Sequence, residues 1–135
     1  MLFRSKGGLF AHLSAVAANS DSPPLPESSE SASVVVVLAS KGYPENPSAG
    51  ELITLHPLAN NIVVFHAGTA RDPNGQLVTA GGRVLNVTAT GPSVESARKD
   101  AYSVIGKSVH FPGMHYRSDI GSSQLRRRQL EPIKT

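Results

Sequence analysis

The chain has 135 residues, a formal net charge of +3 and a hydrophobic fraction of 39%, which together predict one domain with a modest core. It contains no cysteine, which excludes disulfides, thiolate metal sites and a cysteine nucleophile. No apolar run approaches the ~20 residues of a membrane-spanning helix, so we expect no membrane partner.

Residues 1–18 predict a short apolar helix, from Leu9 through Ala17, that docks on the core. Residues 1–20 carry Arg4, Lys6 and several serines but no acidic residue, which is also typical of an organellar targeting peptide. We prefer the helix and expect a cytoplasmic protein.

Residues 19–33 read NSDSPPLPESSESAS, too polar a stretch to bury enough apolar surface to become ordered. We expect a flexible linker there. The run VVVVLAS at 34–40 is continuous and β-branched, which favours a strand buried on both faces. A loop rich in glycine and proline follows, and then shorter strands are expected at 51–55 and 61–66.

Two reversals are expected in the next part of the chain. Asn74-Gly75 is the strongest short-range hairpin signal available. The stretch 76–91, QLVTAGGRVLNVTATG, predicts a second hairpin that turns at Gly81-Gly82 and carries Arg83 at its tip. A planar guanidinium beside accessible backbone suits a phosphate or a carboxylate. The alternative is a plain hairpin with a surface arginine.

One long helix is predicted after Pro92, with Ser93 as its N-cap and an end near Gly106. Its apolar residues recur at helical spacing on one face: Val94, Ala97, Ala101, Val104 and Ile105. Strands followed by one helix and a short strand predict an α+β fold, with a mostly antiparallel, hairpinned sheet or half-barrel and one covering helix.

Several function classes lack support. His110 and His115 are separated by Pro112-Gly113 and have no third ligand at a typical spacing, so no metal site is predicted. No nucleophile elbow, phosphate loop or dinucleotide fingerprint is present. The basic tail, 122–135, has no interleaved aromatic residue that could stack bases, so we expect no nucleic-acid partner.

Polar residues at turns form the remaining candidate site. They are His66 with Gly68-Thr69, Arg83 after Gly81-Gly82, and Tyr116-Arg117-Asp119. Taken singly, the histidine could be a cap residue, and Arg117 with Asp119 a simple ion pair. Taken together, they suggest a face where two arginines meet an anion.

Five segments, in order, resemble one known family: GYPEN, VVFHAGTA, QLVTAGGRVLNVTATG, ESARKDAY and HFPGMHYRSDIG. Residues 34–121 resemble the C-terminal domain of the phosphoribosylamine–glycine ligases, also called glycinamide ribonucleotide synthetases. Five ordered motifs over ~90 residues are far more specific than a lone glycine motif. The resemblance implies the rudiment single hybrid motif found at the end of ATP-grasp ligases.

The resemblance also implies an activity. These ligases join glycine to 5-phosphoribosylamine in de novo purine synthesis and convert ATP to ADP and phosphate. Glycyl phosphate forms first, and the amine then displaces the phosphate. ATP and Mg²⁺ bind mainly to the ATP-grasp domain, against which the C-terminal domain closes, so the expected partner is that domain, in cis or in trans.

The family's motifs extend to individual residues. By similarity, Gly81, Gly82 and Arg83 face the active site and bind the substrate phosphate, and His66 and Thr69 line the same cleft. The Y-R-x-D-I-G motif implies that Arg117 assists anion binding or domain closure and that Asp119 orients it, beside Tyr116. No residue of this chain is expected to be catalytic.

The chain also departs from the family. The R-L-G-D-P-E signature and the metal-binding carboxylates of the ATP-grasp domain are absent, Ser118 replaces a usual basic residue, and Ala49 replaces a common lysine. Phosphoryl transfer depends on positioned Mg-ATP, so we expect the chain to bind no cofactor alone and to be inactive by itself. The alternative is a non-catalytic interaction module derived from the same domain.

Overall fold

The computed structural model describes residues 5–6, 8–20 and 27–122. The predicted basic tail therefore lies almost wholly outside the described residues. The elements in chain order are β1 (Ser5–Lys6), α1 (Leu9–Ala17), β2 (Glu27–Ser28), β3 (Ala32–Ala39), β4 (Thr54–Leu55), β5 (Ile62–His66), β6 (Thr69–Arg71), β7 (Leu77–Thr79), β8 (Arg83–Gly91), α2 (Val94–Val104) and β9 (Val109–His110).

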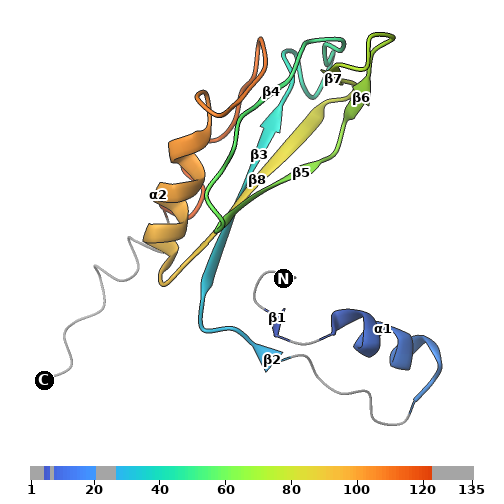
Figure 1. Ribbon diagram of the computed structural model, residues 1–135, viewed down its shortest axis with the longest axis vertical. Coiled ribbons are helices and arrows are strands. Elements are labelled where there is room, and N and C mark those ends of the chain that lie inside the picture. Colours follow the sequence, from blue (N-terminus) through green and yellow to red (C-terminus); the bar gives the residue numbers. More distant parts are fainter. Residues whose placement is uncertain (1–4, 7, 21–26, 123–135) are drawn as a thin grey trace, which may run out of the picture.

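The centre of the fold is an antiparallel sheet of three strands in the order β3-β8-β5. Helix α2 packs against one face of this sheet (Figure 1). Small antiparallel ribbons, β4-β9 and β6-β7, complete one end. The predicted α+β fold, with an antiparallel sheet covered by a helix, is confirmed.

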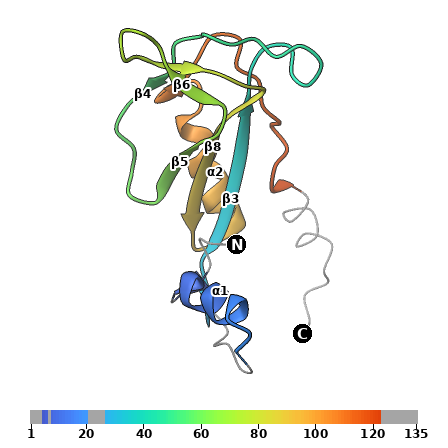
Figure 2. The ribbon, with the colours of Figure 1, turned by 90° about the vertical axis from the view of Figure 1, so that its right-hand side faces the viewer.

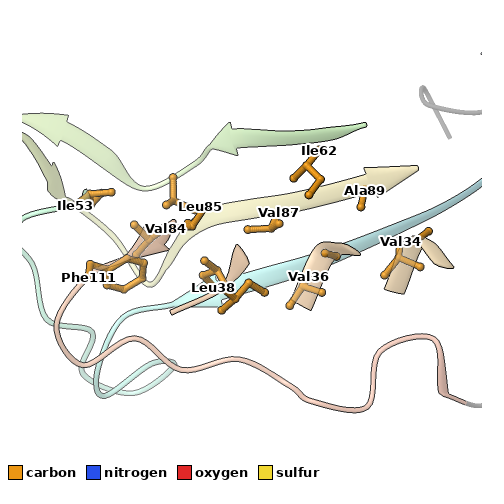
Figure 3. Close-up of a cluster of buried hydrophobic side chains, with 14 residues drawn as sticks. Val34, Val36, Leu38, Ile53, Ile62, Val84, Leu85, Val87, Ala89 and Phe111 are labelled. Atoms are coloured by element: carbon orange, nitrogen blue, oxygen red, sulfur yellow. The ribbon is translucent and has the colours of Figure 1, made fainter. Parts of the chain in front are cut away.

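The core lies between the sheet and α2. Alternate residues of β3 and β8 project into it, and Figure 3 shows them along the sheet with Phe111 at one end. Ala97 and Ala101 of α2 are fully buried against them, because small side chains let the helix approach the sheet closely. The core residues are Val34, Val36, Leu38, Ile53, Ile62, Val84, Leu85, Val87, Ala89, Ala97, Ala101, Ile105, Val109 and Phe111.

Strand β3 is not buried on both faces, so that prediction is wrong. Its burial alternates, and Val35 and Val37 remain 43% and 39% exposed. The reason is that α2 covers only one face, whereas the other face is open to solvent (Figure 2). Val63 and Phe65 of β5 are also exposed on this open face, through their register with β8.

The predicted hairpin around Gly81-Gly82 is also wrong. β7 pairs with β6, whereas β8 pairs with β3 on one side and β5 on the other, so the strands that flank the two glycines do not pair together. Because β8 already has a partner on each edge, it has no free edge for β7. The glycines therefore form a corner between the central sheet and the β6-β7 ribbon.

Two local predictions are confirmed. The Asn74-Gly75 step lies in the reversal between β6 and β7, where Gly75 has a φ of +79° and Asp72 Oδ1 accepts from the Asn74 and Gln76 N–H groups at 3.0 and 2.7 Å. Ser93 is the N-cap of α2, and its Oγ accepts from the Ser96 N–H at 3.2 Å.

Helix α1 forms over the predicted residues but does not dock on the core. It lies beyond the end of the central sheet (Figures 1 and 2), and none of its residues is buried. Its apolar side chains are exposed instead, with Phe10 at 83%, Leu13 at 56% and Val16 at 52%. The expectation failed because apolar composition shows that a helix has a surface to bury, but not what it packs against.

Candidate functional site

The corner at Gly81-Gly82 is held by Ser40, at the end of β3. The Ser40 N–H donates to the Gly82 carbonyl at 2.9 Å, and its Oγ donates to the Gly81 carbonyl at 3.1 Å. A Cβ on Gly82 would lie 2.3 Å from Cδ2 of Tyr43, so the aromatic ring packs directly on the backbone of the corner. A larger residue at position 82 would therefore have to displace the Tyr43 ring.

The segment Ala67-Gly68 is fixed against the same corner. The Ala67 N–H donates to the Val84 carbonyl at 2.9 Å, and the Gly68 N–H donates to the Arg83 carbonyl at 2.8 Å. A Cβ on Gly68 would lie 2.8 Å from the Arg83 oxygen and 2.9 Å from the Gly81 Cα. Three chain segments thus meet at the start of β8 with no space for further side chains between them.

A β-bulge at Val84 determines where Arg83 points. Leu38 pairs with Leu85 and Ala39 pairs with Arg83, so Val84 is an extra residue in β8. In a regular strand, Arg83 would lie on the core face with Leu85, because side chains alternate. The bulge instead buries Val84 completely and leaves Arg83 exposed.

Arg83 and Asn86 line one pocket of about 610 Å³. They are three residues apart and would lie on opposite faces of a regular strand, so the bulge is what brings them to the same side. The pocket is formed by the loop after β3, the end of β5 and the start of β8. Its lining residues are Tyr43, Pro44, Pro47, Ala67, Gly82, Arg83 and Asn86.

The pocket carries the positive charge of Arg83, which no acidic residue neutralises within the described part of the chain. Arg83 is exposed, and within the described residues its guanidinium has neither an acidic partner nor a hydrogen bond. The backbone N–H groups of Gly81 and Gly82 also have no acceptor among the described residues. A free guanidinium beside free backbone donors is an arrangement suited to a phosphate or carboxylate.

Comparisons with known proteins identify the family of this chain. The family described as "Phosphoribosylglycinamide synthetase, C domain" matches residues 33–123. The chain belongs to this family.

Relatives from bacteria and a plant carry the name phosphoribosylamine–glycine ligase. The protein from Phenylobacterium zucineum is 44% identical over 131 residues, which cover 94% of this chain and 30% of that protein. The protein from Xylella fastidiosa strain Temecula1 is 51% identical over 90 residues, or 66% of this chain and 21% of that protein. The chloroplastic ligase of Arabidopsis thaliana is 42% identical over 106 residues, covering 76% of this chain and 20% of that protein.

A solved structure shows the same fold. The crystal structure of phosphoribosylamine–glycine ligase from Thermotoga maritima matches with a TM-score of 0.64 and 40% identity, over 81% of this chain and 26% of that one. This chain therefore spans less than a third of the length of these ligases.

The structure places the family's motif residues in three groups. Gly82 and Arg83 line the pocket, and Gly81 lies at its corner. His66 and Thr69 are near that corner and contact each other, with 3.2 Å between His66 Nδ1 and Thr69 Oγ1, but they are not among the pocket's lining residues. His66 pairs with Leu85 of the core face, whereas Phe65 pairs with Asn86.

The third group, Tyr116, Arg117 and Asp119, lies along α2 and does not line the pocket. Arg117 and Asp119 form a bidentate pair at 2.9 and 2.7 Å, and this hydrogen-bonded carboxylate raises the pKa of Arg117. The Tyr116 ring lies 6.1 Å from that of Tyr102, centroid to centroid. The structure thus does not bring Arg117 to Arg83, and a role for Arg117 in anion binding stays a prediction.

Helix α2 holds this segment with its own polar residues. Arg98 donates from Nε to the Ile120 carbonyl at 3.0 Å and from Nη2 to the Ser118 carbonyl at 2.7 Å. The Tyr102 hydroxyl donates to the Arg117 carbonyl at 2.5 Å and accepts from the Ile120 N–H at 3.2 Å. The motifs ESARKDAY and YRSDIG are thus two halves of one structural contact.

The sequence analysis missed five lining residues: Tyr43, Pro44, Pro47, Ala67 and Asn86. The first three belong to a loop about 40 residues before Arg83, and nothing in the chain order shows that this loop covers the corner. Asn86 could have been recognised from the sequence as a candidate site residue, because asparagine is uncommon within a strand.

The described part of the chain offers little to a metal ion or a membrane. None of its residues form a group of three or more His, Asp or Glu that could hold a metal. Among the same residues, no helix is both long and apolar enough to cross a membrane.

Proposed function

We propose that this chain is the substrate-clamping C-terminal domain of a phosphoribosylamine–glycine ligase. The reaction joins glycine to 5-phosphoribosylamine, with conversion of ATP to ADP and phosphate, in de novo purine synthesis. The observation that carries the proposal is the unpaired Arg83 in the pocket beside the Gly81-Gly82 corner. The proposed reaction is supported by the family to which the chain belongs. The proposed role in binding the substrate phosphate is supported by the geometry of the pocket.

In this role the chain supplies binding and orientation rather than chemistry. Arg83 donates a bidentate pair of hydrogen bonds to the phosphate of the amine substrate, and the N–H groups of Gly81 and Gly82 complete the cradle. Holding the phosphate fixes where the amine lies, so that it meets the activated carboxyl of glycine in a productive position.

The residues described here do not fit Mg-ATP. Magnesium requires oxygen ligands, usually including one or two carboxylates, and the described residues hold no acidic cluster of that kind. We therefore assign ATP and Mg²⁺ to an ATP-grasp portion of the ligase, in cis or in trans. On this assignment we expect the chain by itself to turn over no substrate.

The open face of the β3-β8-β5 sheet is the surface we assign to that ATP-grasp portion. Val35, Val37, Val63 and Phe65 give this face an exposed apolar patch, and Asn86 connects it to the pocket. The known ligases contain more than twice as much chain again, which supplies a partner of sufficient size. A cytoplasmic location stays a prediction, since the alternative is organellar targeting by residues 1–20.

A titration with inorganic phosphate, followed by backbone amide NMR, tests the phosphate cradle. We expect the amide signals of Gly81 and Gly82 to shift on saturation and the shifts to disappear in Arg83→Gln. Arg71→Gln removes an exposed arginine outside the pocket and serves as the matched control. Unchanged phosphate binding in Arg83→Gln would contradict the clamp.

A coupled ADP-release assay tests the assignment of ATP and Mg²⁺ to the ATP-grasp portion of the ligase. The purified chain is given ATP, Mg²⁺, glycine and freshly generated phosphoribosylamine. We expect no glycine-dependent release of ADP. Turnover would show that the chain holds an ATP site and would overturn the assignment of ATP to another part of the ligase.

A further inference from the structure

Asn86 is an unusual residue for its position. It lies in β8, the central strand, and its register partners on the open face are Val37 of β3 and Phe65 of β5. Asparagine is depleted in strands, and its neighbours on this face are β-branched or aromatic. A valine or threonine would suit the fold better at this position, which suggests that Asn86 serves something other than stability.

The carboxamide of Asn86 is also unused by the fold. It is only partly buried, and within the described residues it makes no hydrogen bond. Asn61, by contrast, donates from Nδ2 to the Thr90 carbonyl and to Asp100 Oδ2, at 3.0 and 2.8 Å. The structure therefore contains one asparagine that ties elements together and one whose amide faces a pocket without a partner.

The bulge at Val84 gives this amide a neighbour. It turns Arg83 to the side of the strand that Asn86 occupies, and the two are the nitrogen-bearing side chains that line the pocket. A guanidinium recognises an anion, whereas a carboxamide offers both donors and an acceptor and so suits a neutral hydroxyl or amine. The pair therefore matches a ligand that carries both kinds of group.

We propose that Asn86 is a specificity-determining residue, which binds a hydroxyl of the sugar next to the phosphate held by Arg83. The pocket then selects a sugar phosphate over free phosphate, with Arg83 supplying affinity and Asn86 the preference. This inference rests on the proposed function, because it places the anion at Arg83. The apolar wall of Tyr43, Pro44 and Pro47 provides a surface for the sugar ring.

Parallel NMR titrations of the full chain with ribose 5-phosphate and with inorganic phosphate test the proposal. We expect wild type to bind ribose 5-phosphate about five- to tenfold more tightly than phosphate, as one or two hydrogen bonds would give. The Asn86 side-chain amide signals should shift with the sugar phosphate and much less with phosphate alone.

Two substitutions of nearly equal shape separate recognition from folding. Asn86→Val and Asn86→Thr both favour the strand, and they differ by a methyl group in place of a hydroxyl. We expect Asn86→Val to lose the preference but keep the phosphate affinity, and Asn86→Thr to keep part of the preference. Thr88→Val, one step along the same face and outside the pocket, should change neither.

The outcomes distinguish the inference from the proposed function. If Asn86→Val keeps the full preference while Arg83→Gln loses binding, the role of Asn86 is wrong and the clamp stands. If Arg83→Gln binds both ligands as wild type does, the clamp itself is wrong. A wild-type chain that binds both ligands equally, or neither at millimolar concentration, overturns the inference directly.

Discussion

Gly68 brings the chain segments of the pocket together at a distance that a larger residue fits only if the backbone shifts. A Cβ on Gly68 would meet the Arg83 carbonyl oxygen and the Gly81 Cα at 2.8 and 2.9 Å, both of them backbone atoms. Backbone atoms cannot rotate away as the end of a side chain can. The corner must therefore open before any larger residue fits at position 68.

Gly68→Ala should consequently lower the free energy of unfolding by about 1–3 kcal/mol, as overpacking at a tight contact does. Chemical denaturation measures the change. Gly8→Ala is the control, because a Cβ there would lie at an ordinary 3.4 Å from the Ala11 side chain. Equal stability of the Gly68 and Gly8 variants would show that the corner relaxes without cost.

At the scale of elements, the stability of helix α2 depends on its N-cap residue, Ser93. The Ser93 hydroxyl satisfies one of the N–H groups that have no partner within the first turn. Ser93→Ala should cost about 1 kcal/mol in the free energy of unfolding. Ser103→Ala in the same helix removes a hydroxyl that is not a cap and should cost less, as urea denaturation of both variants would show. A larger loss in Ser103→Ala would contradict the cap.

The contact between α2 and residues 116–122 gives a second element-scale prediction. Tyr102→Phe removes the hydroxyl that bonds the Arg117 carbonyl and the Ile120 N–H, and should cost about 1–2 kcal/mol. Hydrogen exchange at the Ile120 amide should quicken accordingly. Tyr116→Phe keeps both bonds and is the control, so similar exchange in the two variants would contradict this role for Tyr102.

Local signals predicted local structure well. The Asn74-Gly75 reversal, the Ser93 cap and the helical face with Ala97 and Ala101 each depend on neighbouring residues, and each is confirmed. The hairpin at Gly81-Gly82 was wrong because the residues of β8 pair with β3 residues 44–59 positions earlier and with β5 residues 19–27 positions earlier. Sequence spacing does not reveal which distant strand takes an edge.

The candidate site shows the same division. Gly82 and Arg83 were expected from their own motif and do line the pocket. Tyr43 reaches the pocket through a loop that is distant in sequence, and Asn86 reaches it through a bulge. Alternation along β8, applied without the bulge, would have placed Asn86 and Arg83 on opposite faces.

For the whole molecule, we expect the open face of the β3-β8-β5 sheet to contribute to binding the ATP-grasp portion but little to the stability of the isolated chain. Val37 and Val63 are about 40% exposed, so replacing both with lysine removes little burial from the isolated chain. The double variant should keep its melting temperature to within about 5 °C. We expect it to fail to restore activity to the ATP-grasp portion of a relative, such as the Phenylobacterium zucineum ligase without its C-terminal region.

Ser103→Lys on α2 adds a charge away from this face and is the control. Restored activity with the control and none with the double variant would support the open face as the contact surface. Equal restoration by both would place the contact elsewhere on the molecule.

The bulge at Val84 has a consequence for protein engineering. Gly81 to Asn86 form a portable unit, because the corner, the extra residue and the two pocket side chains lie within six consecutive positions. Transplanted into another antiparallel sheet, the unit should carry its anion-binding side chains to the solvent face only if the extra residue is transplanted with it. A graft one residue shorter would turn the arginine toward the interior of the host protein.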